Sequence, residues 1–169
     1  MSISDAVPLA VMIAGALTGA AIDLRTGRVP NPLTASLACA GLVRAASGLG
    51  RLNVGAAVAG LAVGALLMLP GYLAGATGGG DVKLVAAAGT MLGPTATLWA
   101  VLFTLLAGAV IATGVAVWRG RLRLTLYGLA SLLQTAGLDA SGIDATDAGS
   151  RFAYAPAIAI GTIAAAVLA

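Results

Sequence analysis

Long apolar stretches, separated by short polar ones, most restrict what this chain can fold into. They run over residues 6–22, 33–48, 54–74, 82–93, 95–118 and 152–168. Only 9% of the residues are charged, whereas soluble domains carry about 25%. A membrane span needs about 20 apolar residues, and tilt or packing relaxes that length. The sequence therefore predicts an all-α integral membrane protein, a bundle of about six transmembrane helices forming a single domain over residues 1–169.

The fourth stretch, 82–93, is short for a span. Gly93-Pro94 makes a natural turn after it, so it is predicted to form a helical hairpin with the stretch that follows. The glycines and alanines that fill these stretches suit close helix packing in lipid. The polar connection at 119–151 is predicted to hold an interfacial helix and then a solvated cytoplasmic loop.

Basic residues indicate the orientation, because cytoplasmic loops of membrane proteins are rich in Arg and Lys. No basic residue precedes the first apolar stretch, which favours an uncleaved helix over a signal peptide. With the N-terminus outside, only Arg44 and Arg51 among the arginines lie outside. We therefore expect a multi-pass protein of the cell inner (cytoplasmic) membrane, with the lipid bilayer as a partner. Since topology explains the basic residues, no nucleic acid partner is expected.

The residues that are missing narrow the chemistry. The chain has no histidine, and Cys39 is its single cysteine. Ser-His catalysis, His-ligated metal sites and cysteine-based zinc sites are therefore excluded, and neither a metal nor a cofactor is expected. There is no glutamate either, so side-chain carboxylate chemistry depends on six aspartates: Asp5, Asp23, Asp81, Asp139, Asp144 and Asp147.

Two of these aspartates lie at one membrane face in the predicted topology. Asp23 ends the first stretch and Asp81 begins the fourth after three crossings, so both face the cytoplasm. Taken alone, each aspartate has a non-catalytic explanation. Asp23 can be a charge that flanks the membrane beside Arg25 or Arg28, and Asp81 can be the N-cap of a helix. Together they suit acid–base chemistry, because two close carboxylates share a proton. The ionised member can then take a proton from water while the protonated member polarises a carbonyl.

Three segments resemble a known family. Gly78-Gly79-Gly80-Asp81 resembles the GxGD motif of membrane aspartyl proteases, and its continuation GGGDVKL is similar to the prepilin peptidases. DLRTGRVPN, residues 23–31, resembles their D-x-R-x-x-x-[IV]-P-N segment, and YAPAIAIG, residues 154–161, their last-helix pattern. The resemblance implies an aspartic endopeptidase that cleaves the leader peptide of type IV pilin-like (prepilin) precursors at the cytoplasmic membrane face, with Asp23 and Asp81 as catalytic residues.

The resemblance also implies supporting residues. Gly78 and Gly80 belong to the motif before Asp81 and leave room for a substrate chain. Lys83 matches a lysine of the family, although a snorkelling membrane anchor is an equally good explanation for it. Pro30 and Asn31 are expected to fix the turn into the second span.

Larger, bifunctional members of the family carry a cysteine-rich cytoplasmic insert and also N-methylate the new pilin terminus. Here the first cytoplasmic loop is expected to have about ten residues and no cysteine pair, so N-methyltransferase activity is not expected. The chain is similar to the compact peptidase-only branch of Flp-type, tight-adherence pili. Archaeal preflagellin peptidases are the related alternative, and the motifs specify neither the particular pilin nor the oligomeric state.

Two further hypotheses remain from the residues. A presenilin-like protease shares GxGD, but it carries a PAL motif that is absent here. A non-catalytic small membrane transporter or pilus-assembly scaffold would use the two aspartates as an ion or proton site. Cleavage of a precursor separates this last class from a peptidase, because a transporter would leave leaders intact.

Overall fold

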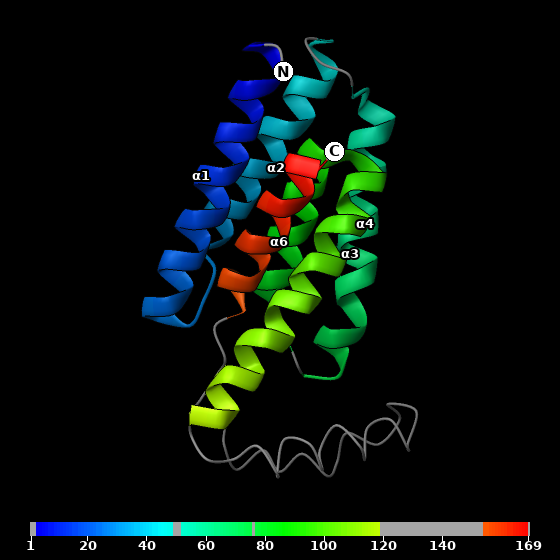
Figure 1. Ribbon diagram of the computed structural model, residues 1–169. Coiled ribbons are helices and arrows are strands. Elements are labelled where there is room, and N and C mark those ends of the chain that lie inside the picture. The colour runs from blue at the N-terminus through cyan, green and yellow to red at the C-terminus, as the bar shows by residue number, and fades with distance from the viewer. Residues whose placement is uncertain (1–2, 49–51, 76, 119–153, 169) are drawn as a thin grey trace. The chain divides into compact units, whose positions relative to one another are not determined.

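The computed structural model describes residues 3–48, 52–75, 77–118 and 154–168. These residues form helices and no strand, in the order α1 (Ile3–Thr26), α2 (Asn31–Ala46), α3 (Val54–Leu73), α4 (Gly79–Trp118) and α6 (Ala155–Leu168) (Figure 1). The predicted all-helical class is confirmed for this part of the chain. The predicted interfacial helix and loop at 119–151, with Asp139, Asp144 and Asp147, lie outside the described residues.

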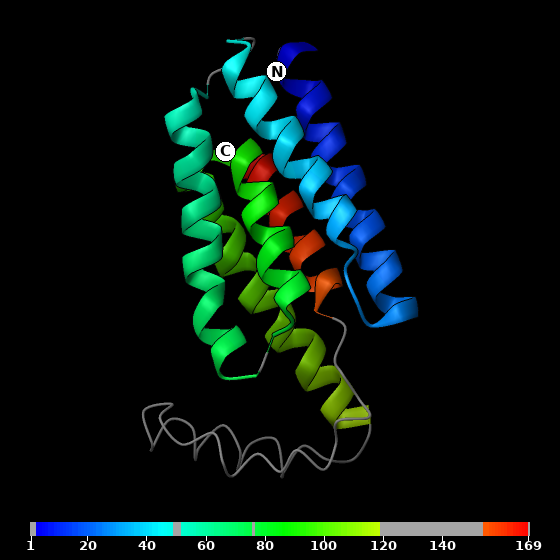
Figure 2. The same cartoon turned by 180° about the vertical axis from the view of Figure 1, so that it is seen from behind.

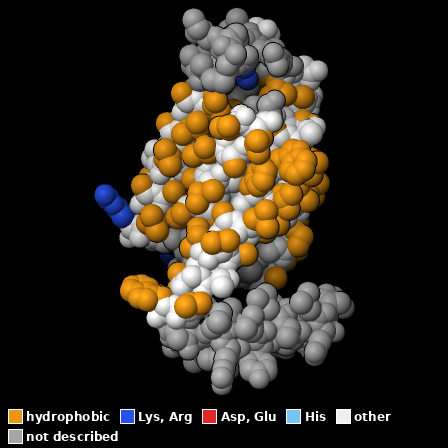
Figure 3. All heavy atoms as spheres, in the orientation of Figure 1, with side chains coloured by type: hydrophobic (Ala, Val, Ile, Leu, Met, Phe, Trp, Pro, Cys, Tyr) orange, Lys and Arg blue, Asp and Glu red, His pale blue; other side chains and the backbone are white. Residues whose placement is uncertain are grey.

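Three helical segments are long and apolar enough to cross a membrane: Leu9–Thr26, Val54–Leu73 and Gly79–Val115. α6 is a shorter apolar helix, and α2 has 16 residues. Figure 3 shows hydrophobic side chains over much of the described surface in view, and large ones such as Leu66 and Leu73 are exposed. An outer surface of this kind is typical of a membrane-contacting protein. The count of six spans stays a prediction.

α4 consists of two helical segments joined at Gly93. The backbone there is not helical, with φ 75° and ψ 174°, a conformation that glycine adopts without a steric penalty. Pro94 follows it and has no N–H group to continue the helical bonding. Figures 1 and 2 show the chain reversing its direction at this point, as the Gly93-Pro94 dipeptide predicts.

The first segment of α4 lies in the interior of the bundle. Residues 84–90 are all buried, which happens only when other elements enclose a helix on every side. A Cβ atom at Gly60 of α3 would overlap the carbonyl oxygen of Gly89, and one at Gly89 would overlap that of Gly60. The two backbones therefore touch directly, and this interior position accounts for the small residues of the short stretch 82–93.

The chain divides into two compact units. The first comprises Met1–Gly108 and Ala153–Ala169, and the second is Ala109–Phe152, of which the structure describes 109–118. The single-domain organisation over 1–169 stays a prediction. Within the first unit α6 packs against α1. The end of α1 and the beginnings of α2, α4 and α6 lie at the same end of this unit (Figures 1 and 2).

Candidate active site

Asp23 lies in the last turn of α1 and is buried, with 7% of its surface exposed. Its Oδ2 accepts a hydrogen bond of 3.3 Å from the backbone N–H of Ala155, the first residue of α6. The first N–H groups of a helix have no partner within the helix, so Asp23 caps α6 from a different part of the chain. The helix continues to Thr26, so Asp23 precedes the end of α1 instead of marking it.

Asp81 is the third residue of α4 and is also buried, with 6% of its surface exposed. Its Oδ2 accepts a hydrogen bond of 3.0 Å from the backbone N–H of Gly78. The helix begins at Gly79, so Gly78 occupies the N-cap position that the sequence alternative gave to Asp81. Asp81 instead reaches back from the third helical position, as the acidic partner of a capping box does.

Asp23 lies in the last turn of α1 and Asp81 in the first turn of α4, and these two helix ends lie at the same end of the first unit (Figures 1 and 2). We call the two residues the aspartate pair; burial affects the Asp81 carboxyl more than the charge of Asp23 does. Arg25 and Arg28, the alternative partners of Asp23, are exposed, whereas Asp23 is buried. Each member of the pair also anchors a helix start, Asp23 that of α6 and Asp81 that of α4.

The supporting residues of the two sequence motifs lie against one another. Lys83 donates a hydrogen bond of 3.0 Å from Nζ to Oδ1 of Asn31, the first residue of α2. Pro30 precedes α2 in an extended conformation, and its carbonyl accepts the N–H of Thr34 at 3.3 Å. This supports the expectation that Pro30 and Asn31 shape the entry into the second span.

The glycines before Asp81 are closely surrounded. A Cβ atom at Gly78 would lie 3.2 Å from Oδ2 of Asp81, and one at Gly80 would lie 3.0 Å from the Cβ of Val29. Side chains at these positions would press on the carboxylate or on the segment that follows α1. The link between α1 and α2 is only residues 27–30, shorter than the expected ten-residue loop, because both helices extend further than the apolar stretches do.

Tyr154 is a residue of the site to which the sequence assigned no role. It precedes Ala155, and the charge of Asp81 reaches its hydroxyl group. Its ring lies against Gly108, where a Cβ atom would be 2.8 Å from Cε2. In the sequence, only its place in the YAPAIAIG segment indicated Tyr154. No local pattern predicts that α6 approaches α1, because this approach is a tertiary contact.

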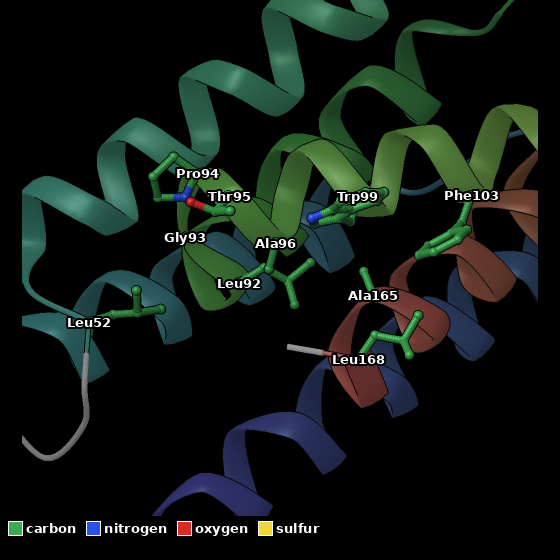
Figure 4. A pocket seen from close by; sticks show the side chains of 10 residues that line it. All are labelled: Leu52, Leu92, Gly93, Pro94, Thr95, Ala96, Trp99, Phe103, Ala165 and Leu168. Atoms are coloured by element: carbon green, nitrogen blue, oxygen red, sulfur yellow. The ribbon is translucent and has the colours of Figure 1, made fainter.

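A separate cavity of about 620 Å³ lies beside the break of α4 at Gly93 (Figure 4). Gly93 follows Asp81 by twelve residues, about 18 Å of helix, so the cavity is remote from the aspartate pair. Trp99 and Phe103 stack along it with ring centroids 6.0 Å apart. Its lining is apolar apart from one threonine: Leu52, Leu92, Gly93, Pro94, Thr95, Ala96, Trp99, Phe103, Ala165 and Leu168.

Chemically, the aspartate pair offers proton transfer. Over the described ranges, no three or more His, Cys, Asp or Glu side chains gather in a way that could hold a metal ion. Two buried carboxylates that approach each other closely can hold one proton between them and exchange it with a bound water.

The sequence of this chain is similar to those of known proteins. The model of the type IV leader peptidase family matches residues 10–113, a range that contains both aspartates. Two proteins of Burkholderia pseudomallei, strains 1026b and K96243, named "Prepilin leader peptidase/N-methyltransferase", are each 39% identical over 118 residues. The match covers 66% of this chain and 38% of each relative, so the chain spans well under half of their length.

No solved structure matches this chain. The family model nevertheless covers more than half of the sequence, from the middle of α1 to the second segment of α4, and includes the whole aspartate pair. The chain therefore belongs to the type IV leader peptidase family.

Proposed function

We propose that this chain is a membrane aspartic endopeptidase that cleaves the leader peptide of type IV pilin-like precursors at the cytoplasmic face of the inner membrane. One observation carries the proposal: two buried carboxylates, Asp23 near the end of α1 and Asp81 near the start of α4, lie at the same end of the first unit (Figures 1 and 2). Membership of the leader peptidase family supports the choice of substrate, as do the names of its two relatives.

In the proposed reaction the aspartate pair holds a single proton. The ionised carboxylate removes a proton from a bound water, whose oxygen attacks the scissile carbonyl carbon, while the protonated carboxyl donates to the carbonyl oxygen. Collapse of the tetrahedral intermediate breaks the C–N bond, and the proton taken from water passes to the leaving amine. The C=O bond re-forms, and the proton on the former carbonyl oxygen returns to the carboxylate that donated it. Water is thus added across the peptide bond, and the pair returns to its starting state.

The backbone anchors suit this chemistry. In both residues the anchoring bond uses Oδ2, which accepts from Ala155 in one case and from Gly78 in the other. The proposal gives Oδ1 of each residue to the water and the substrate carbonyl. Fixed donors of this kind keep reacting groups oriented, and orientation supplies a large part of enzymatic rate enhancement.

The proposal includes six membrane spans in a single domain, an external N-terminus and no N-methyltransferase activity. The break of α4 at Gly93 supports two spans within that element, and three segments have the length and composition of spans. The short α1–α2 link, residues 27–30, supports the compact peptidase-only form, because it has no room for an additional domain.

The topology can be tested by thiol labelling of intact spheroplasts. In a Cys39→Ala background, Ser47→Cys and Thr95→Cys should react with a membrane-impermeant maleimide. Thr26→Cys and Ala140→Cys should react only after the membrane is opened. The physical reason is that six spans put both of the latter residues in the cytoplasm. Labelling of 26 and 140 from opposite sides would exclude the six-span topology.

The activity can be tested with purified protein in lipid vesicles and a purified pilin-like precursor. Mass spectrometry should detect a precursor shortened by its leader, with an unmethylated new N-terminus even when S-adenosylmethionine is added. An intact precursor alongside well-folded protein would favour a transporter or scaffold. A methylated product would refute the peptidase-only assignment while leaving the cleavage proposal in place.

A further inference from the structure

Two contacts join the segment 23–31, which runs from the last turn of α1 through the α1–α2 link to the first residue of α2, to the first turns of α4, one on each side of Asp81. On one side Gly80 packs on Val29, whose side chain is buried, and a Cβ atom at Gly80 would be 3.3 Å from the backbone nitrogen of Val29. On the other side Nζ of Lys83 donates to Oδ1 of Asn31 at 3.0 Å. The catalytic turn of α4 is therefore held at both of its flanks by a single short segment.

That segment also begins at the other aspartate. The backbone N–H of Gly27 donates to the carbonyl of Asp23 at 2.7 Å, with Gly27 at φ 64°, the left-handed conformation that ends helices. The hydroxyl of Thr26 donates to the carbonyl of Arg28 at 3.0 Å. The backbone from Asp23 to Asn31 is thus defined by local bonds along most of its length.

We propose that Lys83 and Asn31 are positioning residues, whose side-chain hydrogen bond closes a ring from Asp23 through the link to Asn31, across to Lys83 and back to Asp81. This inference rests on the proposed peptidase function. The packing of Val29 on Gly80 limits how closely the link approaches α4, and the Lys83–Asn31 bond limits how far it moves away. The two contacts together limit how far the start of α4 can move relative to the end of α1.

The geometry accounts for Lys83 better than a lipid anchor does. A snorkelling lysine needs no fixed partner for its ammonium group, whereas the ammonium group of Lys83, although exposed, bonds a side chain 52 residues away in the sequence. A hydrogen bond from a charged donor is stronger than a neutral one, and here it spans two helix starts. Misplacement of reacting groups by about 1 Å costs roughly 100-fold in rate, so even a modest relaxation of the link affects catalysis.

The test is a double-mutant cycle on leader cleavage with Lys83→Met, Asn31→Leu and the combined variant. Each single change should lower kcat roughly 10- to 100-fold and leave KM within about twofold, because both residues act through the aspartate pair. The combined variant should be no slower than the slower single variant, since both changes break one bond. Asn31→Asp can still accept the hydrogen bond from Lys83 and should retain most of the activity. This variant keeps the test decisive if Asn31→Leu fails to fold.

The matched control is Arg28→Met, which removes an exposed cation from the same link and should leave kcat unchanged. Unchanged kcat in Lys83→Met, effects that multiply in the combined variant, or a change confined to KM would each overturn the positioning proposal. Asp81→Asn is assayed in parallel. If Asp81→Asn cleaves normally, the proposed function itself fails. If it is inactive while Lys83→Met is fully active, only the positioning role fails.

Discussion

Replacing Asp81 with asparagine is expected to abolish leader cleavage, lowering kcat by about 10³-fold or more. Asparagine has nearly the same shape, and its side-chain oxygen can still accept the hydrogen bond that Gly78 now donates to Asp81 at 3.0 Å. The start of α4 is therefore preserved, and the change removes the ionisable carboxyl group, which alone can take up and give back a proton. Cleavage of a purified precursor, followed by mass spectrometry, measures the effect, and thermal unfolding in detergent shows that the protein remains folded.

The control for Asp81→Asn is Asp139→Asn, which removes a carboxylate from the predicted solvated loop and should retain most of the activity. Near-normal cleavage by well-folded Asp81→Asn would contradict the catalytic role and leave Asp81 as a capping residue of α4. The unfolding measurement distinguishes a catalytic defect from misfolding. The mechanism requires that Asp81→Asn is inactive while its unfolding temperature stays normal.

Replacing Asp23 with asparagine is expected to cause a similar loss, and the combined Asp23→Asn, Asp81→Asn variant should be no worse than either single change. Residues that act as one unit are not additive, because removing either partner already destroys the shared-proton arrangement. The same cleavage assay, extended to long reaction times, measures the residual rates. Rates that fall multiplicatively in the combined variant would show that the two carboxylates act independently.

Asp23→Ala separates the structural role of Asp23 from its chemical role. Alanine removes the acceptor for the Ala155 N–H, whereas asparagine keeps one. Loss of a helix cap costs about 1 kcal/mol of stability, so the alanine variant should unfold at a lower temperature than the asparagine variant. Both should be equally inactive. Asparagine and alanine variants of equal stability would show that the bond to α6 contributes little.

The sequence predicted both aspartates at one membrane face, because that prediction depends only on the number of crossings between them. Apolar stretches and basic flanks are local properties of the sequence. Lipid requires every span to satisfy its backbone hydrogen bonds internally, so each span can be predicted separately. The glycine and proline at 93–94 predicted a turn for the same reason, since the φ angle and the missing N–H are properties of those residues alone.

The partners of each carboxylate could not be predicted. Asp23 accepts from Ala155, which lies 132 positions further along the chain, and no pattern around either residue indicates that α6 approaches α1. Likewise, Asp81 could equally have been an N-cap, because the glycines before it allow several starting points for the helix.

Sequence alone determined that this chain is helical and suited to a membrane, because composition and hydropathy are sums over residues. It also excluded histidine chemistry and limited any side-chain carboxylate chemistry to six aspartates. Tertiary structure decided that the short stretch after Asp81 is enclosed by other helices and that Lys83 meets Asn31. It also decided that both catalytic candidates are buried against backbone N–H groups. These features depend on how closely separate helices pack. Close packing requires two surfaces that fit each other, and no single segment of the sequence contains both.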